Sequence, residues 1–144
     1  MRVYLDNAAT TPLDKEVLKT IYEVMEGHYG NPSSIHAHGR EVRTLIEKAR
    51  KTVSSLLHAS PSEFFFTSGG TEADNMAIRC GIIDHGIKHA ITSAIEHHAV
   101  LHTLQALESS GLIRLSYVKT DHKGVIDYQH LEEIVSTNER SCVS

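Results

Sequence analysis

The segment Thr67–Glu72 carries two adjacent glycines and then a hydroxyl residue, a pattern that can hold an anion. Glycines that follow a strand let the backbone approach a ligand, and the next helix points its free N–H groups and its positive dipole end at that ligand. Gly70 allows the close approach, and Thr71 adds a hydroxyl donor. The segment lacks the Gly-Lys-Ser/Thr ending of a nucleotide-binding P-loop, so the pattern favours a phosphate monoester over a nucleoside triphosphate. Taken alone, the same pattern is also typical of an ordinary strand-to-helix connection.

Histidine is frequent, with 11 in 144 residues, and two pairs have a spacing that suits metal binding. His98 with His102, and His85 with His89, are four residues apart, which on a helix places both imidazoles on one face. A metal-binding module is therefore an alternative hypothesis. No third ligand with a recognisable spacing follows, and His89 is expected to begin a strand, so no residue is assigned to a metal. Stoichiometric zinc in the purified protein would favour this alternative.

Cys80 and Cys142 are the two cysteines, and they form neither a C-x-x-C pair nor a dense disulfide pattern. Neither has an evident cationic neighbour that would stabilise a thiolate, so we predict packing thiols that stay reduced. The segment Asp121–Gly124 contains Lys123, which we interpret as a solvated turn residue.

The elements that must position these residues alternate between helical and strand-like periodicity, which predicts an α/β layer with a parallel or mixed sheet. A loop rich in turn formers is expected from Gly30 to Gly39. Helices are expected at 14–27, at 42–58, from Thr71 to about Cys80, at 97–109 and at 127–135. The first of them has Asp14 as its expected cap and carries its apolar residues in one stripe. Strands are expected at Phe64–Thr67, His89–Ser93 and Ile113–Val118, and another begins at Cys142.

Composition limits the classes of function. The chain is 40% hydrophobic and 22% charged, as in a globular domain, and its net charge is −4. No basic run is present that could neutralise a phosphate backbone, so nucleic acid is not an expected partner. No apolar stretch approaches the ~18 residues of a membrane span, and the first residues lack a signal-peptide pattern, so we expect a soluble cytoplasmic protein with no membrane partner.

Four ordered blocks of the sequence resemble the cysteine desulfurases of the NifS and IscS type, which belong to the class V aminotransferase family of fold-type I pyridoxal-phosphate enzymes. The resemblance covers nearly the whole chain. The four blocks are Tyr4–Pro12, Gly30–His36, Phe66–Asn75 and Glu96–Val100.

The resemblance implies a three-layer α/β/α fold with a mixed, mostly parallel sheet. Residues 1–60 would form an amino-terminal segment with helices, and residues 61–144 the first, truncated part of the large cofactor domain. Gly70 and Thr71 match the positions that hold the phosphate of pyridoxal 5′-phosphate. His97 matches the histidine that lies against the pyridine ring and can move protons, a role that suits an imidazole because its unperturbed pKa is ~6.5.

A lone histidine at the start of a helix is more often a surface residue, and only the surrounding block reverses that interpretation for His97. The segment from Asn7 to Thr11, and the loop with Asn31, Pro32 and His36, resemble parts that border the family's active site. For these segments, a role as turns and connections is as well supported as direct contact.

The resemblance also implies the reaction and the partners. L-cysteine would be converted to L-alanine, with the sulfur passed to an enzyme cysteine as a persulfide and then to an iron–sulfur scaffold or another acceptor protein. The protein would be a homodimer.

Two groups that this chemistry requires are missing from the 144 residues. The Schiff-base lysine of a Ser-x-His-Lys segment and the persulfide cysteine of a mobile loop are both absent. We therefore expect an amino-terminal fragment that is inactive alone. Two further hypotheses stay open, namely a non-catalytic remnant retained for dimerisation and a related class V enzyme that acts on another amino acid.

Overall fold

The computed structural model describes residues 1–136 and 140–144, and the chain divides into two compact units, Met1–Phe66 and Thr67–Ser144. From the sequence, a boundary was expected after residue 60. Within the described ranges, no helix is both long enough and apolar enough to cross a membrane.

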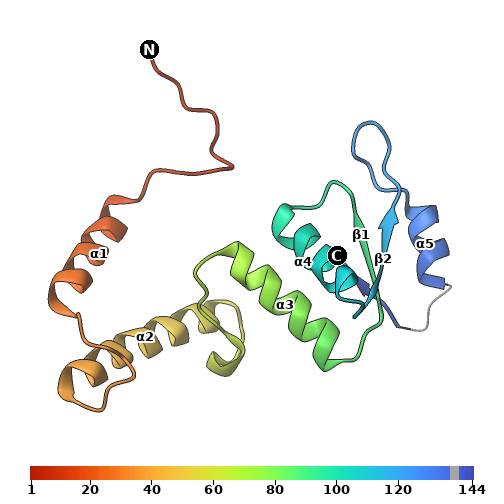
Figure 1. Cartoon of the computed structure of the whole chain (residues 1–144). Helices are drawn as coiled ribbons and strands as arrows, with labels where there is room; N and C mark the ends of the chain where they lie inside the picture. The colour runs from red at the N-terminus through yellow and green to blue at the C-terminus, as the bar shows by residue number, and fades with distance from the viewer. Residues whose placement is uncertain (137–139) are drawn as a thin grey trace. The chain divides into compact units, whose positions relative to one another are not determined.

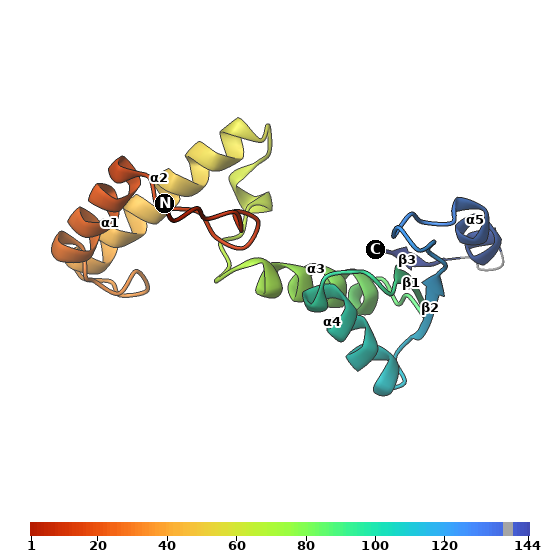
Figure 2. The same cartoon turned by 90° about the horizontal axis from the view of Figure 1, so that it is seen from above.

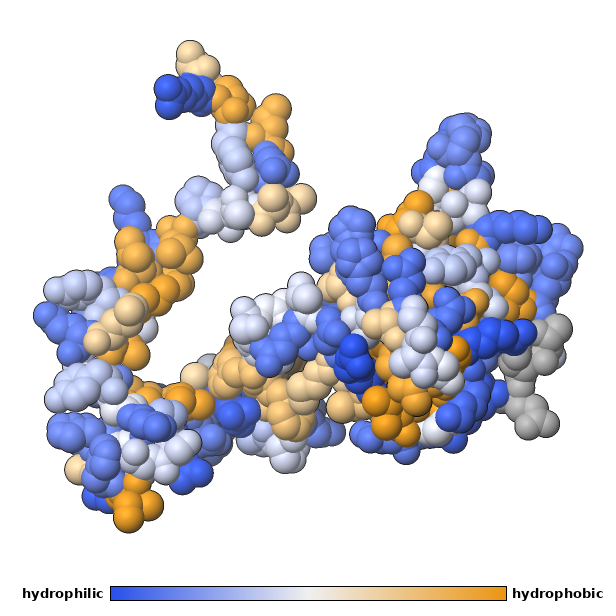
Figure 3. Space-filling view, viewed as in Figure 1, coloured by the Kyte–Doolittle hydropathy of each residue, from blue (hydrophilic) through white to orange (hydrophobic). Residues whose placement is uncertain are grey.

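The first unit contains α1 (Lys15–Gly27), α2 (Ala37–Leu56) and the short 3₁₀ helix η1 (Pro61–Glu63). The predicted cap of α1 is confirmed, because a carboxylate oxygen of Asp14 accepts a hydrogen bond from the Glu16 N–H at 2.8 Å. The apolar stripe predicted on this helix is present, but every residue of α1 is exposed. Figure 3 shows the corresponding orange surface over α1.

The loop before α2 packs tightly against the first turn of that helix. The His36 Nδ1 accepts a hydrogen bond from the Gly39 N–H at 3.3 Å, so the helix begins at Ala37. The prediction that the loop extends to Gly39 is therefore wrong at its carboxyl end. A Cβ at Gly39 would overlap the backbone carbonyls of Asn31 and Ser34, which explains why glycine suits this close approach.

The strand predicted at Phe64–Thr67 is wrong. This segment pairs with no strand in the described part of the chain, and Phe65 and Phe66 are exposed. Its Phe64 carbonyl is instead hydrogen-bonded to a side chain, because an N–H group of the Arg50 guanidinium donates to it at 2.5 Å. The same guanidinium lies 5.2 Å from the centre of the Phe66 ring. An apolar run thus predicts a strand only where a neighbouring strand is available for pairing.

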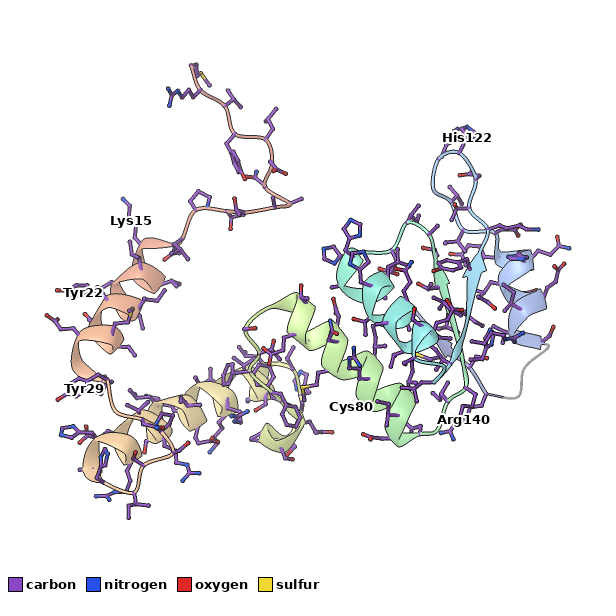
Figure 4. The ribbon with its side chains drawn as sticks, in the orientation of Figure 1. Lys15, Tyr22, Tyr29, Cys80, His122 and Arg140 are labelled. Carbon is purple, nitrogen blue, oxygen red and sulfur yellow. The ribbon has the colours of Figure 1, made fainter. Side chains whose placement is uncertain are left out.

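The second unit has the predicted order of helices and strands. It consists of α3 (Gly70–Asp84), β1 (His89–Ser93), α4 (His98–Ser109), β2 (Arg114–Val118), α5 (Tyr128–Ser136) and β3 (Cys142–Val143). The three strands form one sheet in the order β2-β1-β3, with both pairings parallel. Lys123 lies in the predicted turn after β2, exposed to solvent, and His122 lies at the tip of that loop (Figure 4).

The sheet has helices on both faces, which confirms the three-layer α/β/α fold. Helices α3 and α4 lie on one face and α5 on the other (Figures 1 and 2). Crossovers between parallel strands are right-handed, and β2 and β3 lie on opposite sides of β1. The connections through α4 and α5 must therefore cover opposite faces of the sheet.

The core lies between the sheet and the pair α3 and α4. Its buried members are Ile82, Ala90, Leu104, Leu107, Ile113 and Leu115. Cys142 packs against this cluster as predicted, and burial raises the pKa of its thiol. The same prediction is wrong for Cys80, which is exposed on α3 (Figure 4).

His89 joins three neighbouring segments of the sheet through its buried ring. Its Nδ1 lies 2.9 Å from the Ser141 hydroxyl, and its Nε2 lies 2.8 Å from the Ser116 hydroxyl. Burial, and secondarily the positive charge of Arg114, lower the pKa of His89. The structure therefore favours the neutral imidazole and confirms that His89 begins a strand.

We expect the free energy of unfolding to fall as the pH drops below about 6.5, the ordinary pKa of an imidazole. Below that value the unfolded chain binds a proton at His89 while the folded chain resists it, so stability is greatest above this range and is lost on acidification. Urea unfolding of wild type and His89→Asn across this range measures the effect, with the exposed His122→Asn as the matched control. His89→Asn is expected to flatten the pH dependence, and equal slopes in all three proteins would contradict the prediction.

Candidate functional site

The amino-terminal end of α3 leaves its first backbone N–H groups open. Asp14, His36 and His97 cap α1, α2 and α4 with side-chain hydrogen bonds, whereas Gly69, the cap residue of α3, has no side chain to do so. A Cβ placed at Gly69 or Gly70 would meet no atom within 4 Å. The helix therefore presents unsatisfied donors and the positive end of its dipole to open space.

Local hydrogen bonds hold the turn before α3 in shape. The Ser68 N–H donates to Glu72 Oε2 at 2.6 Å, and the Thr67 hydroxyl donates to the Gly69 carbonyl at 3.2 Å. The hydrogen bonds from Ser68 lower the pKa of Glu72. The Glu72 carboxylate thus accepts the hydrogen bond of the Ser68 N–H, and the N–H groups of Gly70 and Thr71 stay available for a ligand.

His97 is both the cap of α4 and a member of the candidate site. It follows the carboxyl end of β1 after a short loop, the edge at which parallel α/β sheets bind ligands. Its Nδ1 accepts a hydrogen bond from the Ala99 N–H at 3.1 Å, and its own backbone N–H donates to Glu96 Oε1 at 3.0 Å. The imidazole is exposed and is oriented by the helix that it caps.

Thr71 and His97 line one cavity of about 300 Å³ between α3 and α4. The structure therefore brings two of the three predicted site residues together, and the third, Gly70, is the first residue of α3. The cavity is also lined by Asn75, Arg79, His98, Ala99, His102, Thr103 and Ala106.

Asn75 and Arg79 were not predicted as site residues. They follow Thr71 at intervals of four residues, and this spacing places all three on one face of α3. The Asn75 amide donates to the Thr71 carbonyl at 2.9 Å. The helical period counted from Thr71 would have identified both residues.

The cavity suits a ligand with a phosphate monoester and an aromatic ring. Thr71 lines the cavity and offers its N–H and hydroxyl to phosphate oxygens, the N–H of the adjacent Gly70 is open at the start of α3, and His97 supplies a flat imidazole. Pyridoxal phosphate has both groups, so the residues fit the cofactor that the sequence implies.

Neither histidine pair gains a third metal ligand from the residues that the structure describes. His98 and His102 stack with ring centres 5.0 Å apart. His85 follows the last residue of α3 and His89 lies in β1, so these two residues do not share a helix face. Among the residues that the structure describes, no group of three His, Cys, Asp or Glu side chains could hold an ion. The structure therefore adds no support to the metal-binding alternative.

The other predicted site segments belong to the first unit, where their contacts are local. The Tyr4 hydroxyl lies 2.7 Å from the Thr10 hydroxyl in the amino-terminal segment. In the loop before α2, the side-chain oxygen of Asn31 accepts from the Ser33 N–H at 2.9 Å. These contacts agree with a role as turns, and a direct role at the cavity stays a prediction.

Comparison with known proteins identifies relatives over nearly the whole chain. The family model described as aminotransferase class-V matches residues 3–143. A putative cysteine desulfurase IscS 1 of Bacillus subtilis is 44% identical over 135 residues, which cover 92% of this chain and 35% of the relative.

Two solved structures have the same fold. A NifS-like protein superposes with a TM-score of 0.84 and 40% identity, over 98% of this chain and 38% of its own. SspA in complex with cysteine gives a TM-score of 0.79 and 34% identity, over 93% of this chain and 38% of its own. The chain spans about a third of the length of the curated relatives that it matches.

Proposed function

The chain belongs to the aminotransferase class-V family, and we propose that the protein of which it forms the amino-terminal part is a pyridoxal-phosphate-dependent cysteine desulfurase. That protein would convert L-cysteine to L-alanine and pass the sulfur atom to one of its own cysteines as a persulfide. The observation that carries the proposal is the presence of Thr71 and His97 on one cavity. Relatives named cysteine desulfurase support the choice of reaction within the family.

Gly70 and Thr71 would hold the cofactor phosphate through their N–H groups and the Thr71 hydroxyl. His97 would lie against the pyridine ring. When bound, pyridoxal phosphate supplies an electron sink for bonds broken at the substrate α and β carbons. The chain's own contribution is to seat the phosphate at the end of α3 and to orient one imidazole from α4.

L-cysteine is the proposed substrate, and a solved relative whose title names a complex with cysteine supports it. We further propose a homodimer in the cytoplasm that delivers sulfur to an iron–sulfur scaffold or another acceptor protein. These proposals rest on family membership and not on contacts of the described residues.

A binding experiment on the 144 residues tests the cofactor assignment. Pyridoxine 5′-phosphate is a suitable probe because it has the ring and the phosphate but no aldehyde, so it forms no Schiff base with surface lysines. Calorimetry is expected to show one saturable site for this probe and much weaker binding of pyridoxine, which lacks the phosphate. Equal affinity for the two compounds would contradict a phosphate site at α3.

A further inference from the structure

His97, which the proposed function places at the cofactor, is also the residue that caps α4, and this capping bond constrains where its ring carries a proton. A helix cap accepts a hydrogen bond from a backbone N–H in the first turn, usually through an oxygen of Ser, Thr, Asp or Asn. In α4 the acceptor is a ring nitrogen, because His97 Nδ1 receives the Ala99 N–H at 3.1 Å. The backbone of His97 is not helical, with φ −59° and ψ 142°, as is usual for a cap residue.

A ring nitrogen can accept a hydrogen bond only while it keeps its lone pair. A neutral imidazole has one nitrogen with a proton and one without, so acceptance at Nδ1 places the proton on Nε2. A protonated ring would direct a second N–H at the Ala99 N–H and lose the cap.

We propose that α4 fixes the tautomer of the neutral His97 ring, with the proton on Nε2, so that the nitrogen left free by the cap is an N–H donor and not a lone pair. Nε2 lies across the ring from Nδ1, and among the described residues it has no hydrogen-bond partner. The Glu96 carboxylate accepts from the His97 backbone and not from its ring, so it leaves the Nε2 proton free. The significance of this donor for catalysis rests on the proposed function, whereas the tautomer itself does not.

In the bound enzyme, His97 then stabilises an acceptor atom of the cofactor or substrate by donating a hydrogen bond. It can serve as a base only after the Ala99 N–H releases Nδ1. The capping bond therefore couples any use of His97 as a base to a change in the first turn of α4.

Nitrogen NMR of the 144-residue chain without cofactor tests the tautomer directly. Long-range ¹H–¹⁵N correlation at about pH 8.5, well above the ordinary pKa of an imidazole, distinguishes a protonated from an unprotonated ring nitrogen. His97→Asn assigns the signals by their disappearance. His36 is the internal control, because its Nδ1 caps α2 by accepting the Gly39 N–H, which is the same kind of bond on another helix.

The expected result is an unprotonated Nδ1 and a protonated Nε2 for His97. A proton on Nδ1, or rapid averaging between tautomers, would overturn the inference. Either result leaves the cofactor test intact, because binding of pyridoxine 5′-phosphate is measured separately.

Capping variants give a second readout. His97→Ala removes the acceptor and is expected to raise the unfolding equilibrium constant about fivefold, whereas His97→Asn supplies another good cap and is expected to restore most of the stability. Stabilities that are equal in wild type and His97→Ala would show that the cap is not formed in solution, which would also overturn the inference.

Discussion

Replacing Thr71 by valine is expected to weaken the binding of pyridoxine 5′-phosphate by about tenfold or more. The substitution keeps the size and branching of the side chain and removes only the hydroxyl donor. A hydrogen bond to a charged group contributes about 1.5–3 kcal/mol, and 1.4 kcal/mol corresponds to a tenfold change in affinity. Titration calorimetry of both proteins measures the change, and pyridoxine serves as the ligand without phosphate.

Thr52→Val is the matched control. Thr52 lies on α2, and its hydroxyl donates to the Lys48 carbonyl at 3.0 Å, so its loss is expected to leave the affinity unchanged. An equal loss of affinity in both variants would indicate a general effect on folding. Unchanged affinity in Thr71→Val would remove Thr71 from the phosphate site.

The 144 residues alone are expected to show no desulfuration of L-cysteine. The sequence has no Ser-x-His-Lys segment to hold pyridoxal phosphate covalently and no mobile-loop cysteine placed to take the sulfur, and catalysis of this kind requires both groups. Incubation with pyridoxal phosphate, L-cysteine and a thiol reductant, followed by assay of sulfide and alanine, is expected to give only the background of the same mixture without protein.

Lys123→Arg makes this prediction specific. Lys123 lies in an exposed turn whose backbone N–H groups at Lys123 and Val125 both donate to the Asp121 carboxylate, at 2.8 and 2.9 Å. If wild type produced equal amounts of sulfide and alanine and Lys123→Arg did not, our interpretation of Lys123 as a solvated turn residue would be wrong.

The local signals in the sequence were sufficient to predict much of the second unit. Periodicity and turn residues identified β1 at its observed bounds and placed α3, α4 and β2 in their observed order. Part of the site prediction relied on the same signals, because the glycine turn before α3 indicated an anion site, whereas the role of His97 came only from the resemblance of its sequence block to the family. Both features are set within a few residues of the chain, so they need little knowledge of the rest of the fold.

The errors came from features that depend on distant parts of the chain. Phe64–Thr67 has the apolar pattern of a strand, but a strand needs a neighbouring strand to pair with. Among the described residues, the segment contacts the Arg50 side chain instead. Cys80 has no local signal of its exposure, which depends on which face of α3 packs against α4. Helix α1 has the expected apolar stripe, yet amphipathicity alone does not say what covers it.

The dual position of His97 could not have been predicted in full from spacing. The sequence supports either a surface residue at a helix start or a cofactor ligand, and the structure combines the two positions. Its Nδ1 caps α4 while the residue lines the cavity that Thr71 also lines. A capping histidine is held by its own helix, which makes it a well-oriented group for a site at the end of β1.

The central claim is that the first turn of α3 and the side chain of His97 bind one phosphate-bearing aromatic ligand. A ¹H–¹⁵N correlation spectrum of the 144-residue chain, recorded during titration with pyridoxine 5′-phosphate, tests it most directly. We predict saturable shifts of the Gly70 and Thr71 amides and of the His97 ring, all with one dissociation constant. Saturable shifts confined to other residues, or separate dissociation constants for α3 and His97, would contradict it.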